Sequence, residues 1–207
     1  VVVNTNPLYT ARELKHQLND SGAKAILVLE NFAHTLASVI DECPVEHVFV
    51  TSLGDMLGFP KGALINFALR YIKKEVPSYD LPGAIRFNDV LKTGDPDRLE
   101  RPGLDHDDLA FLQYTGGTTG VSKGAMLTHG NIVANVQQAS AWMQQLIEYG
   151  RETIVTALPL YHIFALTANC LVFIKFGGRN VLITNPRDMN GFIKELGKER
   201  FTAITGV

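Results

Sequence analysis

A short loop rich in glycine and threonine, residues 115–120, restricts the fold of this chain more than any other feature. Its three glycines have no Cβ, so backbone N–H groups can turn toward a common centre, and its threonines add hydroxyl donors. Lys123 follows with a positive charge. Such a loop can surround a polyphosphate, and the apolar run before it, residues 108–113, predicts the buried strand that holds the loop in place.

Two common phosphate-binding motifs do not fit this loop. Walker A ends in Gly-Lys-Ser/Thr, whereas Lys123 follows Ser122 and precedes Gly124. The dinucleotide fingerprint needs a residue between its first two glycines, whereas Gly116 and Gly117 are adjacent. We therefore expect neither a P-loop NTPase site nor a Rossmann cofactor turn.

Apolar runs of strand length alternate with helical segments along most of the chain. The expected strands are residues 25–29, 47–50, 111–114, 125–127, 154–158, 180–184 and 201–207. The expected helices are residues 11–20, 32–40, 131–147, 164–176 and 189–199. The alternation predicts an α/β fold with largely parallel sheets and helices on both faces.

Proline and glycine turns concentrate in residues 51–108 and divide the chain into two expected α/β lobes, residues 1–104 and 105–207. A helix is expected within this turn-rich region. Its apolar residues are Leu64, Ile65, Phe67, Ala68, Tyr71 and Ile72, and its basic residues are Lys61, Arg70, Lys73 and Lys74. We prefer the interpretation that the apolar side packs on its own domain, and we keep contact with an anionic membrane surface as the alternative.

Composition excludes several classes of protein. A net charge of -2 and a pI near 6.3 leave no basic stripe for nucleic acid, so no nucleic-acid partner is expected. The two cysteines, Cys43 and Cys170, are far apart, which favours neither a disulfide framework nor a zinc site and fits a reducing cytoplasm. The apolar stretch 163–174 is shorter than the roughly 18 residues of a membrane span.

Two motifs carry a resemblance to a known superfamily. Residues 115–123, Thr-Gly-Gly-Thr-Thr-Gly-Val-Ser-Lys, resemble the signature loop of the acyl-adenylate-forming enzymes, and residues 159–166, Pro-Leu-Tyr-His-Ile-Phe-Ala-Leu, resemble a second motif of that superfamily. Ser122 stands where the family often has proline, which predicts a more flexible loop end without loss of a ligand. Essentially all 207 residues are similar to the bacterial long-chain fatty-acid–CoA ligases.

The resemblance implies a two-step reaction with ATP, Mg²⁺ and coenzyme A. A fatty acid carboxylate attacks the α-phosphate of ATP to give an acyl-adenylate and pyrophosphate, and the coenzyme A thiol then displaces AMP. The implied ATP phosphate ligands are Thr115, Gly116, Gly117, Thr118, Thr119, Gly120 and Lys123. His162 is the implied catalytic residue, and it orients the acyl substrate together with Tyr161. No metal ligand is assigned to this chain.

The resemblance also implies a partial protein. Both ends stop in apolar runs, so we expect a piece of the large AMP-binding N-terminal domain, without the C-terminal domain and without the glutamate that would hold magnesium. Such a piece is expected to be inactive alone. Two alternatives stay open for its function: an adenylation domain that loads a carrier-protein thiol, and a non-catalytic phosphate-binding module.

The expected location is the cytoplasm, with a peripheral position at the inner membrane face left open. Fatty acid, ATP and coenzyme A are the expected small-molecule partners, and a homodimer is left open as well. The acyl chain length is not set by any residue pattern found here.

Overall fold

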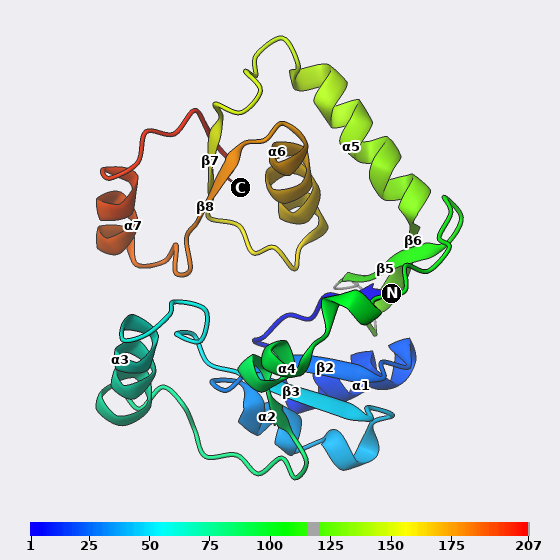
Figure 1. Cartoon of the computed structure of the whole chain (residues 1–207), viewed down its shortest axis with the longest axis vertical. Coiled ribbons are helices and arrows are strands. Elements are labelled where there is room, and N and C mark those ends of the chain that lie inside the picture. Colours follow the sequence, from blue (N-terminus) through cyan, green and yellow to red (C-terminus); the bar gives the residue numbers. More distant parts are fainter. Residues whose placement is uncertain (116–120, 207) are drawn as a thin grey trace. The chain divides into compact units, whose positions relative to one another are not determined.

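The computed structural model describes residues 1–115 and 121–206, and the chain divides into two compact units (Figure 1). Unit 1 comprises Val1–Asn4, Leu104–Gln113 and Ala125–Val207, and unit 2 comprises Thr5–Gly103 and Tyr114–Gly124. The two units are therefore interleaved along the sequence, and each is described by itself.

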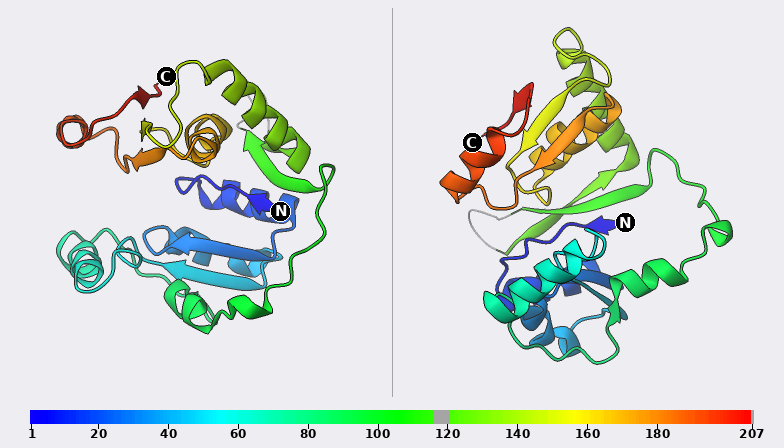
Figure 2. Two further views of the ribbon diagram at one scale, coloured as in Figure 1. Left: turned by 45° about the horizontal axis from the view of Figure 1, so that its top comes forward. Right: turned by 60° about the vertical axis from the view of Figure 1, so that its left-hand side comes forward.

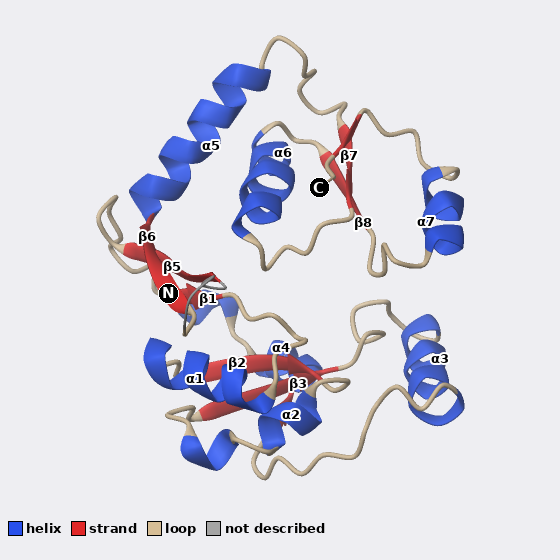
Figure 3. Ribbon diagram, turned by 180° about the vertical axis from the view of Figure 1, so that it is seen from behind, coloured by secondary structure: helices blue, strands red, loops and turns tan. Residues whose placement is uncertain are grey.

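Unit 2 is built on a parallel sheet with the strand order β2 (Ala25–Leu29), β3 (His47–Thr51) and β4 (Ile85–Arg86). Helices α1 (Ala11–Ser21) and α2 (Ala33–Ala37) cover one face of β2 and β3 (Figure 3). Leu14, Leu18, Leu36 and Val39 form the buried core between them, against side chains of both strands. A 3₁₀ turn, η1 (Ile40–Glu42), follows α2.

The ends of α1 follow from its sequence. The Thr10 hydroxyl accepts a hydrogen bond from the Glu13 N–H, and the Glu13 carboxylate accepts one from the Thr10 N–H, which completes a capping box. The Thr10 hydroxyl also donates to the Glu13 carboxylate, and this hydrogen bond, followed by that from the Thr10 N–H, lowers the pKa of Glu13. At the other end Gly22 has φ 61°, the left-handed conformation that glycine adopts without strain.

The turn-rich region of unit 2 contains more regular structure than its sequence suggests. The expected helix is present as α3 (Lys61–Phe67), which continues as a π-helical segment η2 (Ala68–Ile72). Beyond it, β4, α4 (Phe87–Thr93) and a 3₁₀ turn η3 (Pro96–Arg98) were not expected. Two-residue strands and two-turn helices are too short to give a periodic signal.

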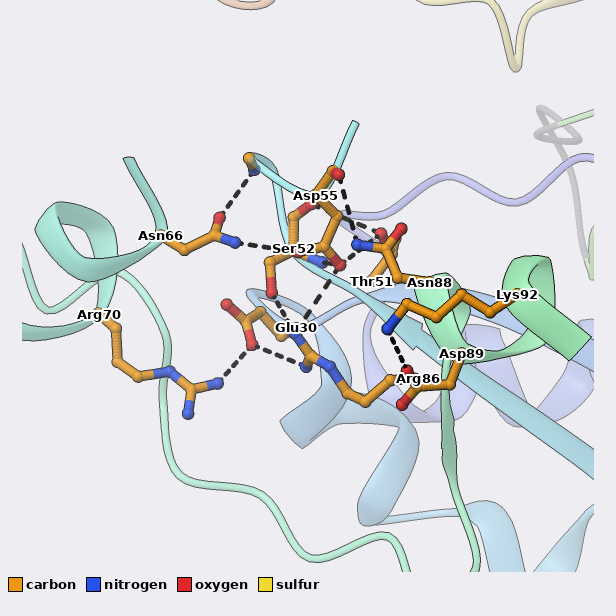
Figure 4. Close-up of polar contacts among 11 residues, drawn as sticks. Glu30, Thr51, Ser52, Asp55, Asn66, Arg70, Arg86, Asn88, Asp89 and Lys92 are labelled. Atoms are coloured by element: carbon orange, nitrogen blue, oxygen red, sulfur yellow. Dashed lines mark hydrogen bonds and ion pairs between the residues drawn. The ribbon is translucent and has the colours of Figure 1, made fainter. Parts of the chain in front are cut away.

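A polar cluster joins the strand ends of unit 2 to η2 and β4 (Figure 4). Glu30, buried after β2, accepts hydrogen bonds from Arg70 and, at 3.3 Å, from Arg86. Arg86 also donates to the Ser52 hydroxyl at 2.7 Å. The Asp55 carboxylate accepts from the Ser52 N–H at 2.8 Å. Two carboxylates and two guanidinium groups thus neutralise one another at the carboxyl end of the sheet.

Unit 1 contains two short sheets. One has the order β1 (Val2–Val3), β5 (Leu109–Thr115) and β6 (Lys123–Thr128), and the other has the order β8 (Arg179–Leu182), β7 (Thr153–Thr156) and β9 (Ala203–Ile204). The last two residues of β5 and the first two of β6 belong to unit 2 by their contacts. β1 runs parallel to β5, and β8 and β9 run parallel to β7.

Helices α5 (His129–Met143), η4 (Ala165–Leu171) and α6 (Val172–Lys175) pack around β7. Ile154 of β7 and Val172, Phe173 and Phe176 form the buried core, and apolar residues of α5 close it from outside. Figure 1 shows α6 between α5 and the strands β7 and β8. Helix α7 (Met189–Leu196) lies between β8 and β9 in the chain.

The parallel α/β fold predicted from the sequence is confirmed. Several bounds differ: α5 ends at Met143 rather than 147 and β9 covers only Ala203–Ile204 of the expected 201–207, whereas β5 and β6 are longer than expected. Cys43 and Cys170 are both free thiols. Over the described residues, the structure has no helix whose length and apolar character suit it to cross a membrane.

Replacing Glu30 tests the polar cluster. Glu30→Gln keeps the size of the side chain but removes the charge that two arginines share, and hydrogen bonds to charged groups carry roughly 1.5–3 kcal/mol each. We expect the free energy of unfolding to fall by about 2 kcal/mol in urea titrations followed by circular dichroism. Glu46→Gln, which breaks the exposed Lys24–Glu46 pair, is the control and should leave the midpoint unchanged. Equal effects of both substitutions would contradict this account.

Candidate functional site

Strands β5 and β6 are neighbours in one sheet and flank the glycine/threonine loop (Figure 2). β5 ends at Thr115 and β6 begins at Lys123. Of the predicted phosphate ligands, Thr115 and Lys123 are described and both are exposed. The other five, Gly116, Gly117, Thr118, Thr119 and Gly120, lie outside the described residues.

Ser122 closes the base of the loop. Its hydroxyl donates to the Thr115 carbonyl oxygen at 2.8 Å, and its own carbonyl oxygen lies 2.8 Å from His16 Nε2. A carbonyl oxygen only accepts, so this ring nitrogen of His16 carries the hydrogen. We expected a more flexible loop end from serine in place of proline, but Ser122 instead makes a side-chain hydrogen bond that proline lacks.

The end of β5, before the loop, is held by α1, the helix that also carries His16. The buried Tyr114 donates its hydroxyl to the Asp20 carboxylate at 2.6 Å. Burial, and then this hydrogen bond, raise the pKa of Tyr114, so the phenol stays protonated. Gly124 of β6 packs against the Tyr114 ring. A Cβ on Gly124 would lie 2.9 Å from a ring carbon of Tyr114, so only glycine fits there.

His16 and Asp20 are four residues apart on α1, one turn of the helix. Through Ser122 and Tyr114, one face of α1 therefore holds both ends of the loop. Helix α1 was predicted correctly from the sequence, but no role was predicted for these two side chains. Their spacing was visible, but nothing in the sequence indicated a partner about 100 residues away.

Lys123 is the first residue of β6. Its side chain is exposed, and it makes no ion pair with any of the residues 1–115 and 121–206. An unpaired ammonium group at the end of a loop rich in N–H and hydroxyl donors can bind a phosphate oxygen.

The second motif lies in unit 1, between β7 and η4. The Tyr161 and His162 rings lie side by side, with centroids 4.8 Å apart. The His162 N–H donates to the Pro159 carbonyl oxygen at 3.0 Å, and the His162 carbonyl oxygen accepts from the Leu166 N–H at 2.9 Å. The imidazole stands at the beginning of the helical segment and is exposed.

Gln113 links this motif to the strand that leads into the loop. Its side-chain amide donates to the Tyr161 carbonyl oxygen at 2.9 Å, and Gln113 precedes Thr115 by two residues on β5. The buried Gln113 Oε1 has no hydrogen-bond partner within the described part of the chain. In the sequence Gln113 stands out only as part of an apolar run, so this contact was not predicted.

The start of α5 is a capping box formed by Thr128 and Asn131. Each side chain accepts a hydrogen bond from the backbone N–H of the other residue. Among the described residues, no group of three or more His, Cys, Asp or Glu side chains is arranged to hold a metal ion.

Comparisons with known proteins agree with these motifs. The family described as AMP-binding enzyme matches residues 1–207. The chain is 60% identical over its whole length to a long-chain-fatty-acid–CoA ligase of Escherichia coli O157:H7, and 56% identical to the ligase of that name in Haemophilus influenzae. It spans 37% of the length of each of these relatives.

A solved structure supports the same assignment. The crystal structure of a long-chain-fatty-acid–CoA ligase from Archaeoglobus fulgidus aligns with a TM-score of 0.64 and 27% identity, covering 94% of this chain and 33% of that one. The family match therefore extends over both units and over both motifs of the candidate site, and this chain belongs to the AMP-binding enzyme family.

Proposed function

We propose that this chain is part of an AMP-forming long-chain fatty-acid–CoA ligase. In the first step a fatty acid carboxylate oxygen bonds to the α-phosphorus of ATP, and the bond to the bridging oxygen of pyrophosphate breaks. In the second step the coenzyme A thiolate attacks the acyl carbon and AMP leaves with the electron pair, which yields the thioester.

The observation that carries this proposal is the 60% identity over all 207 residues to the Escherichia coli ligase. Identity at this level over a whole chain favours the same reaction class more strongly than a shared loop does. It also favours the ligase over an adenylation domain that loads a carrier-protein thiol. A non-catalytic phosphate-binding module stays the alternative for the 207 residues expressed alone, which we expect to be inactive.

The roles of the site residues follow from charge. Joining a carboxylate to a triphosphate brings two anions together, so the protein must neutralise the phosphates and hold the carboxylate in line. In this proposal the loop residues 115–120 and Lys123 bind the β and γ phosphates. His162 and Tyr161 orient the fatty acid carboxylate, and His162 is the residue nearest the chemistry.

The remaining partners are part of the same proposal. Coenzyme A is the acyl acceptor, and Mg²⁺ accompanies ATP without a ligand from this chain. A cytoplasmic location, with peripheral contact at the inner membrane face, suits an enzyme whose substrate is a long-chain fatty acid. A homodimer stays open as an assembly.

ATP–pyrophosphate exchange driven by palmitate tests the first step. A full-length enzyme carrying these 207 residues should catalyse exchange, and Lys123→Met should slow it about 100-fold, the usual effect of losing one stabilising donor. Lys92→Met, which removes an exposed lysine paired with Asp89, is the control and should leave exchange unchanged. Absence of exchange in the unsubstituted enzyme would refute the ligase proposal.

His162→Asn tests carboxylate positioning. We expect kcat/KM for palmitate to fall by about 10- to 100-fold because the carboxylate is less well aligned, while KM for ATP is unchanged. The control is His106→Asn, an exposed histidine in the same unit. A rise in KM for ATP with no change in kcat/KM for palmitate would assign His162 to the nucleotide instead.

A further inference from the structure

The helix formed by α3 and η2 packs against unit 2 through its polar side. Gly62, Asn66 and Arg70 are spaced by four residues and share one face. Asn66 Oδ1 accepts from the Gly54 N–H at 2.7 Å, its Nδ2 donates to Asp55 at 2.9 Å, and Arg70 donates to the buried Glu30. Figure 4 shows the Asn66 and Arg70 side chains directed toward the Asp55 and Glu30 ends of the polar cluster.

Close contact between the backbones of Gly54 and Gly62 also turns this face of the helix toward unit 2. A Cβ on Gly62 would lie 2.2 Å from the Gly54 carbonyl oxygen, and a Cβ on Gly54 would lie 2.4 Å from the Gly62 carbonyl oxygen. The helix therefore approaches the loop after β3 at a point where only glycine fits on either side. Its rotation about its own axis is set by these contacts and by the hydrogen bonds of Asn66 and Arg70.

The apolar residues of the helix consequently face outward. Leu64, Phe67, Tyr71 and Ile72 are exposed, from 56% for Phe67 to 70% for Ile72. The preceding loop adds Met56, Leu57 and Phe59, and Phe59 is 93% exposed. Our preferred expectation, that this apolar side packs on its own domain, is therefore wrong for these four helix residues; only Ile65 and Ala68 are half-buried. We call these seven exposed apolar residues the outer apolar face.

The charges around the outer apolar face are mostly positive. Lys61, Lys73 and Lys74 are exposed beside it. Residues 56–75 contain a single acid, Glu75, which lies 3.9 Å from Lys73. Because Arg70 is turned inward to Glu30, the outward charge comes from the three lysines. An apolar helix face flanked by lysines matches an anionic lipid surface, where apolar burial and lipid charge both favour binding.

We propose that the outer apolar face docks on an anionic membrane surface, with the helix lying in the plane of the lipid headgroups. A second copy of the chain fits less well, because a symmetric contact would bring the lysines of both copies together. The inference rests on the orientation of this helix and is independent of the proposed ATP chemistry.

Vesicle co-sedimentation of the 207-residue chain tests the proposal. We expect binding to phosphatidylcholine vesicles that contain phosphatidylglycerol, and at least tenfold weaker binding to phosphatidylcholine alone. The double variant Leu64→Gln, Phe67→Gln should lose binding at least tenfold. The control variant Trp142→Gln, Leu146→Gln removes two residues of unit 1 that are even more exposed, 87% and 83%, and should bind normally.

Charge-reversal variants distinguish binding to anionic lipid from nonspecific hydrophobic adsorption. Lys73→Glu, Lys74→Glu should weaken binding by about 25-fold or more, at roughly fivefold per lysine near an anionic surface. Arg12→Glu, Arg101→Glu changes the net charge equally at exposed positions elsewhere in unit 2 and is the matched control. Circular dichroism of every variant establishes that it is folded.

A spectroscopic measurement covers the case in which a double variant fails to fold. Tyr71→Trp in a Trp142→Phe background places the only tryptophan on the outer apolar face, and its emission should shift to the blue when anionic vesicles are added. Unchanged emission, no preference for anionic vesicles, or equal losses in the control variants would each overturn the proposal. So would vesicle-free self-association that the Leu64→Gln, Phe67→Gln variant abolishes.

Discussion

The hold of α1 on both ends of the glycine/threonine loop is the interaction on which the candidate site depends. One helical turn supplies His16 for the carbonyl of Ser122 and Asp20 for the hydroxyl of Tyr114. The Ser122 hydroxyl then ties the two strand ends together at Thr115. A loop whose backbone must bind an anion needs fixed ends, because each hydrogen bond that orders the loop in advance reduces the entropy lost on binding.

Local signals in the sequence predicted the frame of the fold well. The capping box at Thr10 and Glu13, the left-handed Gly22 and the run that forms β2 all act over a few residues, so their patterns are complete within the sequence. The position of the loop between two strands was predictable to the same extent, since the loop and Lys123 are contiguous. The binding roles of Thr115, Lys123, Tyr161 and His162 stay predictions.

What the sequence did not show are contacts between distant residues. Glu30 and Arg86 are 56 positions apart, and neither belongs to a motif. Gln113 reaches Tyr161 across 48 positions by a single amide hydrogen bond. Periodicity also gave the wrong orientation for the helix of α3 and η2, because it finds an apolar side but does not say which side meets the protein. The glycines Gly54 and Gly62 and the side chains of Asn66 and Arg70 decided that question.

The contact between Gly54 and Gly62 has a consequence for sequence variation. Each glycine is required by the other's carbonyl oxygen, so a side chain at either position would lift the helix from the loop after β3. Asn66 and Arg70 lie on that same helix face, and the lift would draw both away from Asp55 and Glu30. The two glycines should therefore be kept or lost together among related chains, along with the helix formed by α3 and η2.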